Sequence, residues 1–137
     1  MDRKPKIILL AGPTASGKSK IAIKLSKSLN GEIINADSMQ VYKELRILTS
    51  RPSLSDEKKV KHHLYGIISV KNKFSTGEWL RLATKEIKKI LKKKRTPIIV
   101  GGTGLYYIAL LNGLVKIPNI PGVFRNKIRL QHKKIGQ

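Results

Sequence analysis

A phosphate-binding loop stands between a predicted strand and a predicted helix near the start of the chain. The loop reads Gly12-Pro13-Thr14-Ala15-Ser16-Gly17-Lys18-Ser19 and fits the pattern G-x-x-x-x-G-K-S. An apolar run over residues 7–11 predicts a buried strand before it, and Ile21, Leu25 and Leu29 recur on one helix face after it. The order strand, glycine-rich loop, helix distinguishes a phosphate loop from a glycine-rich turn that fits the pattern by chance.

Such a loop binds anions through its backbone and through two side chains. Its N–H groups point inward, and the N-terminus of the following helix adds a partial positive charge. Lys18 is placed to reach terminal phosphates, and the Ser19 hydroxyl is placed to ligate Mg²⁺. We therefore predict that residues 12–19 bind a polyphosphate or pyrophosphate group.

The rest of the chain alternates between strand and helix signals. Strands are predicted over residues 32–36 and 97–100, a loop with a short helical piece over 38–52, and helices within 53–63, from 76 onward, over 105–111 and over 124–133. The helix from residue 76 begins at a capping box formed by Ser75 and Glu78. This alternation indicates an α/β fold with a parallel sheet flanked by helices.

Three unusual segments follow the predicted strands. They are Gly12–Ser19, Asp37–Gln40 and Gly101–Gly104. Because the carboxyl ends of parallel strands meet at one edge, where ligands bind, we expect the three segments to line a single cleft.

Asp37 is the one acidic residue that directly follows a predicted buried strand. It can take a proton from an attacking nucleophile, or it can form a turn or cap a helix, as Asp often does after a strand. NTP hydrolases usually place a Mg²⁺-binding Asp where this chain has Gly101-Gly102. The pattern therefore favours a kinase-like transferase, or an enzyme with pyrophosphate as leaving group, over a motor or GTPase.

Other polar and aromatic residues allow structural interpretations as well as functional ones. Gly101–Gly104 lets a backbone approach a ligand, or makes a tight turn with Thr103 as helix N-cap, and the two are compatible. His62-His63 cannot share a helix face, so a hydrogen-bonding role is expected rather than joint metal ligation. Trp79 and Tyr106 can stack on bases, although a helical Trp79 more often belongs to the core.

The composition is strongly basic. The chain has 137 residues, enough for one domain, with 29 Lys and Arg against 8 Asp and Glu and a formal net charge of +21. A polyanionic partner such as a nucleic acid explains this charge, and compositional drift toward lysine is the alternative. Without cysteine, disulfides and Cys-based zinc sites are excluded. No signal peptide or membrane-spanning run is apparent, so we expect a cytoplasmic protein that does not enter a membrane.

Four motifs together resemble the N-terminal part of the tRNA dimethylallyltransferase (tRNA isopentenyltransferase) family. They are GPTASGKS from Gly12, NADSMQVYK from Asn35, KHHL from Lys61 and PIIVGGTGLYYIALLNGL from Pro97, in the order and spacing of the family. The resemblance covers about residues 5–130. The last motif is specific to this family, whereas the first is shared by many.

The resemblance implies a fold and a reaction. The fold is a P-loop NTPase-like parallel sheet, and the reaction transfers a dimethylallyl group from dimethylallyl diphosphate to N6 of the adenosine 3′ to the anticodon in tRNA. Lys18 and Asp37 would be the catalytic residues, with Asp37 as general base. Thr14–Ser19, a segment often described as ATP-binding, would hold the diphosphate with Mg²⁺. The tRNA, with its target base flipped out, would be contacted by Asp37, Ser38, Met39, Gln40, Gly101 and Thr103.

The resemblance also implies a domain organisation. Family members are longer, with an inserted helical domain that grips the anticodon arm and a later segment that completes the sheet and supplies an arginine. We expect residues 1–115 to form the transferase core and residues 116–137 to begin the insertion, so that the sheet is truncated before it is complete. The expected partners are the tRNA anticodon arm and dimethylallyl diphosphate. We expect a monomer, or a chain completed by a second polypeptide.

The chain departs from the family pattern at several positions. Residues 46–52 read RILTSRP where the family usually has a sequence close to DIGTAKP, so Arg51 replaces Lys. Gly66 stands where the family usually has Asp, and residues 121–123 replace a usually acidic turn. These departures leave room for a chain that is partial or inactive.

Three other functions are compatible with parts of the sequence. The first is a small nucleoside- or shikimate-type kinase that uses ATP, the second a non-catalytic nucleic-acid-binding remnant, and the third an adenylate isopentenyltransferase acting on free nucleotide. The segments Asp37–Gln40 and Gly101–Tyr106 favour the tRNA enzyme over the kinase. The positive charge favours a larger polyanion over a free nucleotide.

Overall fold

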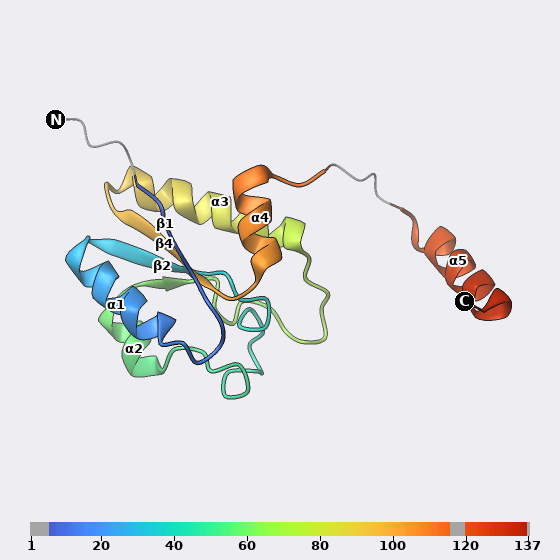
Figure 1. Ribbon diagram of the computed structural model, residues 1–137, viewed down its shortest axis with the longest axis horizontal. Helices are drawn as coiled ribbons and strands as arrows, with labels where there is room; N and C mark the ends of the chain where they lie inside the picture. Colours follow the sequence, from blue (N-terminus) through green and yellow to red (C-terminus); the bar gives the residue numbers. More distant parts are fainter. Residues whose placement is uncertain (1–5, 116–119, 137) are drawn as a thin grey trace.

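The computed structural model describes residues 6–115 and 120–136, which contain a four-stranded parallel sheet with helices on both faces (Figure 1). The strands are β1 (Ile8–Ala11), β2 (Gly31–Asn35), β3 (His62–His63) and β4 (Thr96–Gly101), in the sheet order β1-β4-β2-β3. All three pairings are parallel, which confirms the predicted α/β fold. The strand β3 was not predicted, because two histidines carry no apolar run.

Five helices are described. They are α1 (Lys18–Ser28), α2 (Leu54–Lys59), α3 (Thr76–Lys92), α4 (Gly104–Asn112) and α5 (Gly122–Ile135). Figure 1 shows α1 on one face of the sheet and α3 with α4 on the other. The expected helical piece within residues 38–52 is a series of turns, and the other predicted helices are present.

The two faces of the sheet form two separate apolar cores. Because successive side chains of a strand point to opposite faces, Ile33 and Ile98 pack toward α1, and Ile34 and Ile99 pack toward α3 and α4. Every residue of β2 is buried, since β2 has a neighbour on each side and helices over both faces. The turn that follows β2 is therefore attached to a fully buried strand in the interior of the sheet.

The predicted burial of the first strand and helix is partly wrong. Within the described residues β1 pairs with β4 alone, so it lies at the edge of the sheet and Leu9 is 37% exposed. On α1 the expected apolar face is also displaced, because Ile21 is 47% exposed while Ala22 and Ser26 face the sheet. Small side chains let the helix approach closely, and the Ser26 hydroxyl donates a hydrogen bond to the Gly31 carbonyl at 2.7 Å.

The helix ends follow their sequence signals. Ser75 and Glu78 form the predicted capping box, in which each side chain accepts a hydrogen bond from the other residue's backbone N–H. The helix α4 ends at Gly113, whose φ of 78° is a left-handed conformation suited to glycine. No residue of α5 is buried, and Figure 1 shows this helix apart from the sheet. Residues 116–119, where the inserted domain is expected to begin, lie outside the described residues.

None of the described helices combines the length and the apolar character needed to cross a bilayer.

Candidate functional site

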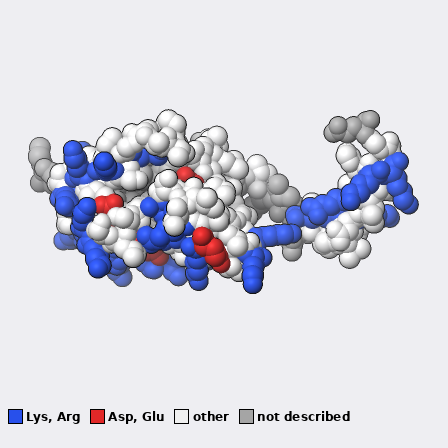
Figure 2. Space-filling view, turned by 90° about the horizontal axis from the view of Figure 1, so that it is seen from below, with Lys and Arg blue, Asp and Glu red and all other residues white. Residues whose placement is uncertain are grey.

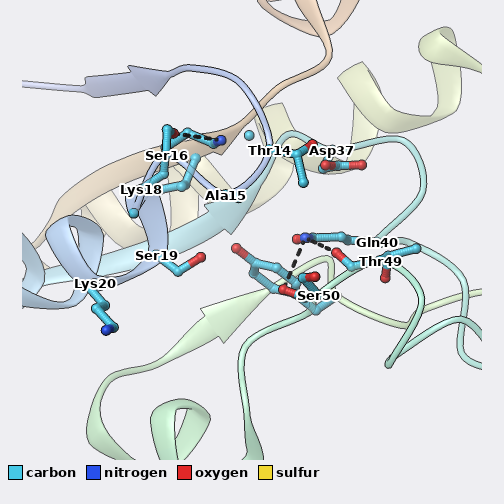
Figure 3. A pocket seen from close by; sticks show the side chains of 14 residues that line it. Thr14, Ala15, Ser16, Lys18, Ser19, Lys20, Asp37, Gln40, Thr49 and Ser50 are labelled. Atoms are coloured by element: carbon cyan, nitrogen blue, oxygen red, sulfur yellow. Dashed lines mark hydrogen bonds between the residues drawn. The ribbon is translucent and has the colours of Figure 1, made fainter.

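The three segments that follow β1, β2 and β4 line one cavity at the carboxyl edge of the sheet (Figure 3). Its volume is about 330 Å³. The residues predicted for the site that line it are Thr14, Ala15, Ser16, Gly17, Lys18, Ser19, Asp37, Gln40 and Gly101. The expectation of a single cleft is thereby confirmed, although Gly12, Pro13, Ser38, Met39 and Thr103 do not line the cavity itself.

The phosphate loop has the backbone conformation that its glycines allow. Gly17, the N-cap of α1, has a φ of 80°, which a residue with a side chain rarely adopts. The Lys18 ammonium donates hydrogen bonds to the Pro13 carbonyl and, at 3.3 Å, to the Ser16 hydroxyl. The Lys18 ammonium is thus held over the loop at the N-terminus of α1, where the helix adds positive potential.

Asp37 occupies a turn that hydrogen bonds fix from both sides. Its N–H donates to Asn35 Oδ1 at 2.9 Å, and its carbonyl accepts from Asn35 Nδ2 at 3.0 Å. Its carboxylate Oδ1 accepts from the Met39 N–H at 2.9 Å, so the turn-forming interpretation of Asp37 is confirmed. Within the described part of the chain no hydrogen bond engages Oδ2, which leaves that oxygen able to accept a proton.

The end of β4 packs directly against this turn. A Cβ on Gly101 would lie 2.1 Å from the carbonyl carbon of Ala36 and 2.7 Å from the Asp37 nitrogen. Glycine is therefore needed here for contact between two backbones. Thr103 has the predicted N-cap position of α4, but its hydroxyl makes no cap bond, and it accepts instead from the Ser38 N–H at 2.9 Å. Thr103 is thus the N-cap by position, as predicted, but its hydroxyl holds the Asp37 turn instead of capping the helix.

The wall of the cavity opposite the phosphate loop contains Asp37 and Gln40, together with residues that the sequence did not single out. In Figure 3 the Asp37 and Gln40 side chains lie across the cavity from Lys18 and Ser19. Gln40 Nε2 donates to the Thr49 carbonyl at 2.7 Å and so ties the two ends of the long turn together. The additional lining residues are Lys20, Thr49, Ser50, Tyr65 and Val100. Thr49 could have been found from its place in the RILTSRP segment.

Tyr65, which also lines the cavity, could not have been found from the sequence, because an aromatic residue after KHHL is not diagnostic of a site. Burial, with smaller contributions from Tyr107 and nearby carboxylates, raises the pKa of the Tyr65 phenol, so it stays neutral. Its ring meets His62 edge-on at 5.4 Å between ring centroids. Tyr65 thus gives the cavity a neutral aromatic wall.

Two departures from the family pattern, Arg51 and Gly66, are one structural feature. A Cβ on Gly66 would lie 2.1 Å from Arg51 Nη1, so the guanidinium fills the space that a side chain at position 66 would need. Gly66 also has a φ of 55°. The Arg51 side chain is 8% exposed and lies 3.6 Å from the Glu57 carboxylate. The larger cation at position 51 and the missing side chain at position 66 therefore accompany one another.

The histidine pair and the two aromatic residues singled out from the sequence contact other protein groups and do not line the cavity. His63 lies between two carboxylates, with Nε2 2.6 Å from Glu32 and Nδ1 3.3 Å from Glu86, which confirms the hydrogen-bonding role expected of this pair. Trp79 and Tyr106 are both buried and stack on one another at 4.2 Å between ring centroids. The idea that they stack on bases is wrong, because each ring covers the other.

Positive charge is spread over the surface. Figure 2 shows Lys and Arg gathered over the lower side of the sheet domain and along α5, with few acidic groups between them. Such a surface attracts polyanions at long range, and the attraction weakens with salt.

Comparisons with known proteins agree with this geometry. The family model described as IPP transferase matches residues 40–137. The tRNA dimethylallyltransferase of Pelagibacter ubique is 63% identical over the whole chain, which covers 44% of that protein. The full-length tRNA isopentenylpyrophosphate transferase structure from Bacillus halodurans has a TM-score of 0.80 and 36% identity, over 96% of this chain and 44% of that one.

A third structure, a eukaryotic dimethylallyltransferase described as acting on tRNA, has a TM-score of 0.79 and 29% identity. The match covers 96% of this chain and 37% of that one. The chain therefore spans about two fifths of the length of the relatives it matches.

Proposed function

The chain belongs to the IPP transferase family, and on this premise we propose that it supplies the donor-binding and proton-accepting part of a tRNA dimethylallyltransferase. The reaction transfers a dimethylallyl group from dimethylallyl diphosphate to N6 of the adenosine 3′ to the anticodon. The observation that carries the proposal is a single cavity lined by both the phosphate loop and Asp37. A phosphate site beside a carboxylate suits a reaction that releases diphosphate and removes a proton.

The phosphate loop binds the diphosphate of the donor. Residues 14–19 line the cavity, and their backbone N–H groups, with the Lys18 ammonium, would stabilise the charge that grows on the departing diphosphate. The hydrogen bonds from Lys18 to Pro13 and Ser16 keep the ammonium near the loop, where a phosphate oxygen would be a further acceptor for it.

The residues present fit a magnesium ion shared with the donor. The Ser19 hydroxyl and the Asp37 carboxylate line the same cavity, while the described residues contain no group of three or more His, Cys, Asp or Glu able to hold a metal by themselves. Mg²⁺ commonly takes few protein oxygens and completes its shell with substrate phosphates and water. When bound, the ion would neutralise diphosphate charge, with Ser19 as its expected protein ligand.

Asp37 acts as the general base. As the bond between the adenine N6 and the donor C1 forms, the bond from C1 to the diphosphate oxygen breaks, and the N6 proton passes to Asp37. The hydrogen bond from Met39 to Oδ1 orients the carboxylate, and Oδ2 receives the proton. We expect Asp37→Asn to keep donor binding and to lose transfer, because the amide has the same shape and cannot act as the base.

The acceptor is the tRNA anticodon arm. Asp37, Gln40 and Gly101 line the cavity, and Met39, 50% exposed, lies in the same turn as Asp37. Together with Ser38 and Thr103 they would contact a flipped-out adenine. The net charge of +21 supports binding of the phosphate backbone. The protein would act in the cytoplasm, where its tRNA is found, as a monomer or with a second polypeptide that completes the site.

The proposal is tested by incubating the chain with labelled dimethylallyl diphosphate and unmodified tRNA, with ATP as the competing donor. Label in the tRNA of the unchanged chain, and none with Asp37→Asn, supports prenyl transfer. Phosphoryl transfer from ATP to a small acceptor, with no label in tRNA, would replace the proposal with a kinase.

A further inference from the structure

Asn35, the last residue of β2, is a fully buried polar residue directly behind the cavity. It does not line the cavity, so no ligand in the cavity can be its partner. We infer that Asn35 is a positioning residue: it holds the Asp37 turn in the conformation that presents the carboxylate to the cavity. The expected effect of Asn35 on prenyl transfer rests on the proposed function. The claim that Asn35 holds the Asp37 turn rests on its hydrogen bonds alone.

The Asn35 side chain is fully hydrogen-bonded. Its Oδ1 accepts from the Asp37 N–H at 2.9 Å. Its Nδ2 donates one hydrogen to the Asp37 carbonyl at 3.0 Å and the other to the Leu64 carbonyl at 3.1 Å. One side chain therefore fixes both peptide groups of Asp37 and attaches them to the segment after β3, 29 residues further on.

The arrangement requires an amide of this length. Aspartate has the same shape but lacks both donors. The buried Leu64 carbonyl would lose its bond from position 35, the Asp37 carbonyl would keep only its bond from the Gln40 N–H at 3.2 Å, and a charge would be buried beside Asp37. Glutamine carries the amide one methylene further from the backbone, and alanine removes all three bonds. Asn35 is thus chosen for hydrogen bonding around Asp37 rather than for filling space.

The backbone of Asn35 extends the attachment into the core. Its carbonyl accepts a hydrogen bond from the Trp79 indole N–H at 2.7 Å, and Trp79 stacks on Tyr106. Trp79 is the sole tryptophan of the sequence, so its fluorescence reports on the element that carries Asp37. The Asp37 turn is therefore linked to α3 and α4 as well as to β3.

The decisive measurement in the unchanged chain is hydrogen exchange by NMR. The side-chain amide protons of Asn35 should be protected, whereas those of the exposed Asn72 exchange as in a free peptide. Equal exchange at the two positions would overturn the inference without any substitution.

Substitution then separates positioning from general stability. In Asn35→Ala, backbone exchange at Asp37 and Met39 should rise at least about tenfold, as expected from the loss of one to two hydrogen bonds, while exchange at Ile98 in the sheet is unchanged. A uniform rise across the sheet would show a merely structural role and contradict the inference. Asn72→Asp is the control for an asparagine substitution at an exposed site.

Pyrophosphate affinity and label transfer to tRNA are measured separately from hydrogen exchange. Asn35→Ala should keep its affinity for inorganic pyrophosphate, which tests the loop, and should lose at least about tenfold in label transfer to tRNA. Normal transfer with a loosened Asp37 turn would overturn the positioning role. Absence of transfer in the unchanged chain would instead count against the proposed function, and the exchange data would still decide the structural question.

Discussion

Gly101→Ala should destabilise the protein strongly, although it adds one methyl group. The new Cβ would lie 2.1 Å from the carbonyl carbon and oxygen of Ala36, and both atoms belong to backbone that cannot rotate away. Restoring an ordinary contact of 3.4 Å requires a shift of about 1.3 Å between β4 and the turn after β2.

The size of the effect follows from two costs. Overpacking of this kind costs about 1–3 kcal/mol. The shift also weakens the hydrogen bond from the Ala36 N–H to the Val100 carbonyl, 2.7 Å long, at about 1 kcal/mol. We therefore expect a loss of about 2–4 kcal/mol in the free energy of unfolding, or about 10 °C in Tm for a domain of this size.

Gly104→Ala is the matched control from the same loop. A Cβ on Gly104 meets nothing within 4 Å, and Gly104 is the first residue of α4, where alanine favours the helix. Urea unfolding followed by Trp79 fluorescence measures both variants. If the two variants unfold within about 0.5 kcal/mol of one another, the ordinary spread for harmless surface changes, the claim that Gly101 serves backbone contact is refuted.

Two further predictions concern the surroundings of the site. Gly66→Ala should cost about 2 kcal/mol or more, because the position has positive φ and the methyl group displaces the Arg51 guanidinium, and adding Arg51→Lys should recover part of the loss; additive costs in urea unfolding would contradict this coupling. Burial alone would raise the pKa of Glu32, but the hydrogen bond with His63 and nearby cations lower it below 4.5. As the pH falls, Glu32 is therefore protonated in the unfolded chain before it is protonated in the folded protein. The stability that Glu32 contributes is present above about pH 4.5 and is lost as the pH falls through its folded pKa. Glu32→Gln should flatten this acid dependence, and an unchanged acid limb in unfolding measured from pH 3 to 7 would show that Glu32 does not carry it.

Much of the fold could be predicted because its signals are local. The phosphate loop, the capping box at Ser75 and the apolar runs of β2 and β4 each depend on residues within a short window. The parallel sheet then follows from alternation, and the shared cleft follows from the edge at which parallel strands end. Asp37 was found in this way, by its place after a buried strand.

What the sequence did not reveal depends on contacts between distant segments. The face of α1 that meets the sheet includes the small residues Ala22 and Ser26. Of the predicted apolar stripe, Leu25 packs against the core, whereas Ile21 and Leu29 are exposed. The need for glycine at position 101 comes from Ala36, 65 residues earlier, and the glycine at position 66 accompanies Arg51. Such pairings leave no periodic pattern in the chain.

The most direct test of the central claim is calorimetric binding of dimethylallyl diphosphate in the presence of Mg²⁺. We expect Lys18→Ala to weaken binding by at least about tenfold, since a charge-assisted hydrogen bond contributes about 1.5–3 kcal/mol. Lys24→Ala, which removes the same charge from the exposed side of α1, should bind within about twofold of the unchanged chain because its charge is screened by solvent. Equal affinity of the Lys18→Ala variant and the unchanged chain would contradict the assignment of this loop as the diphosphate site.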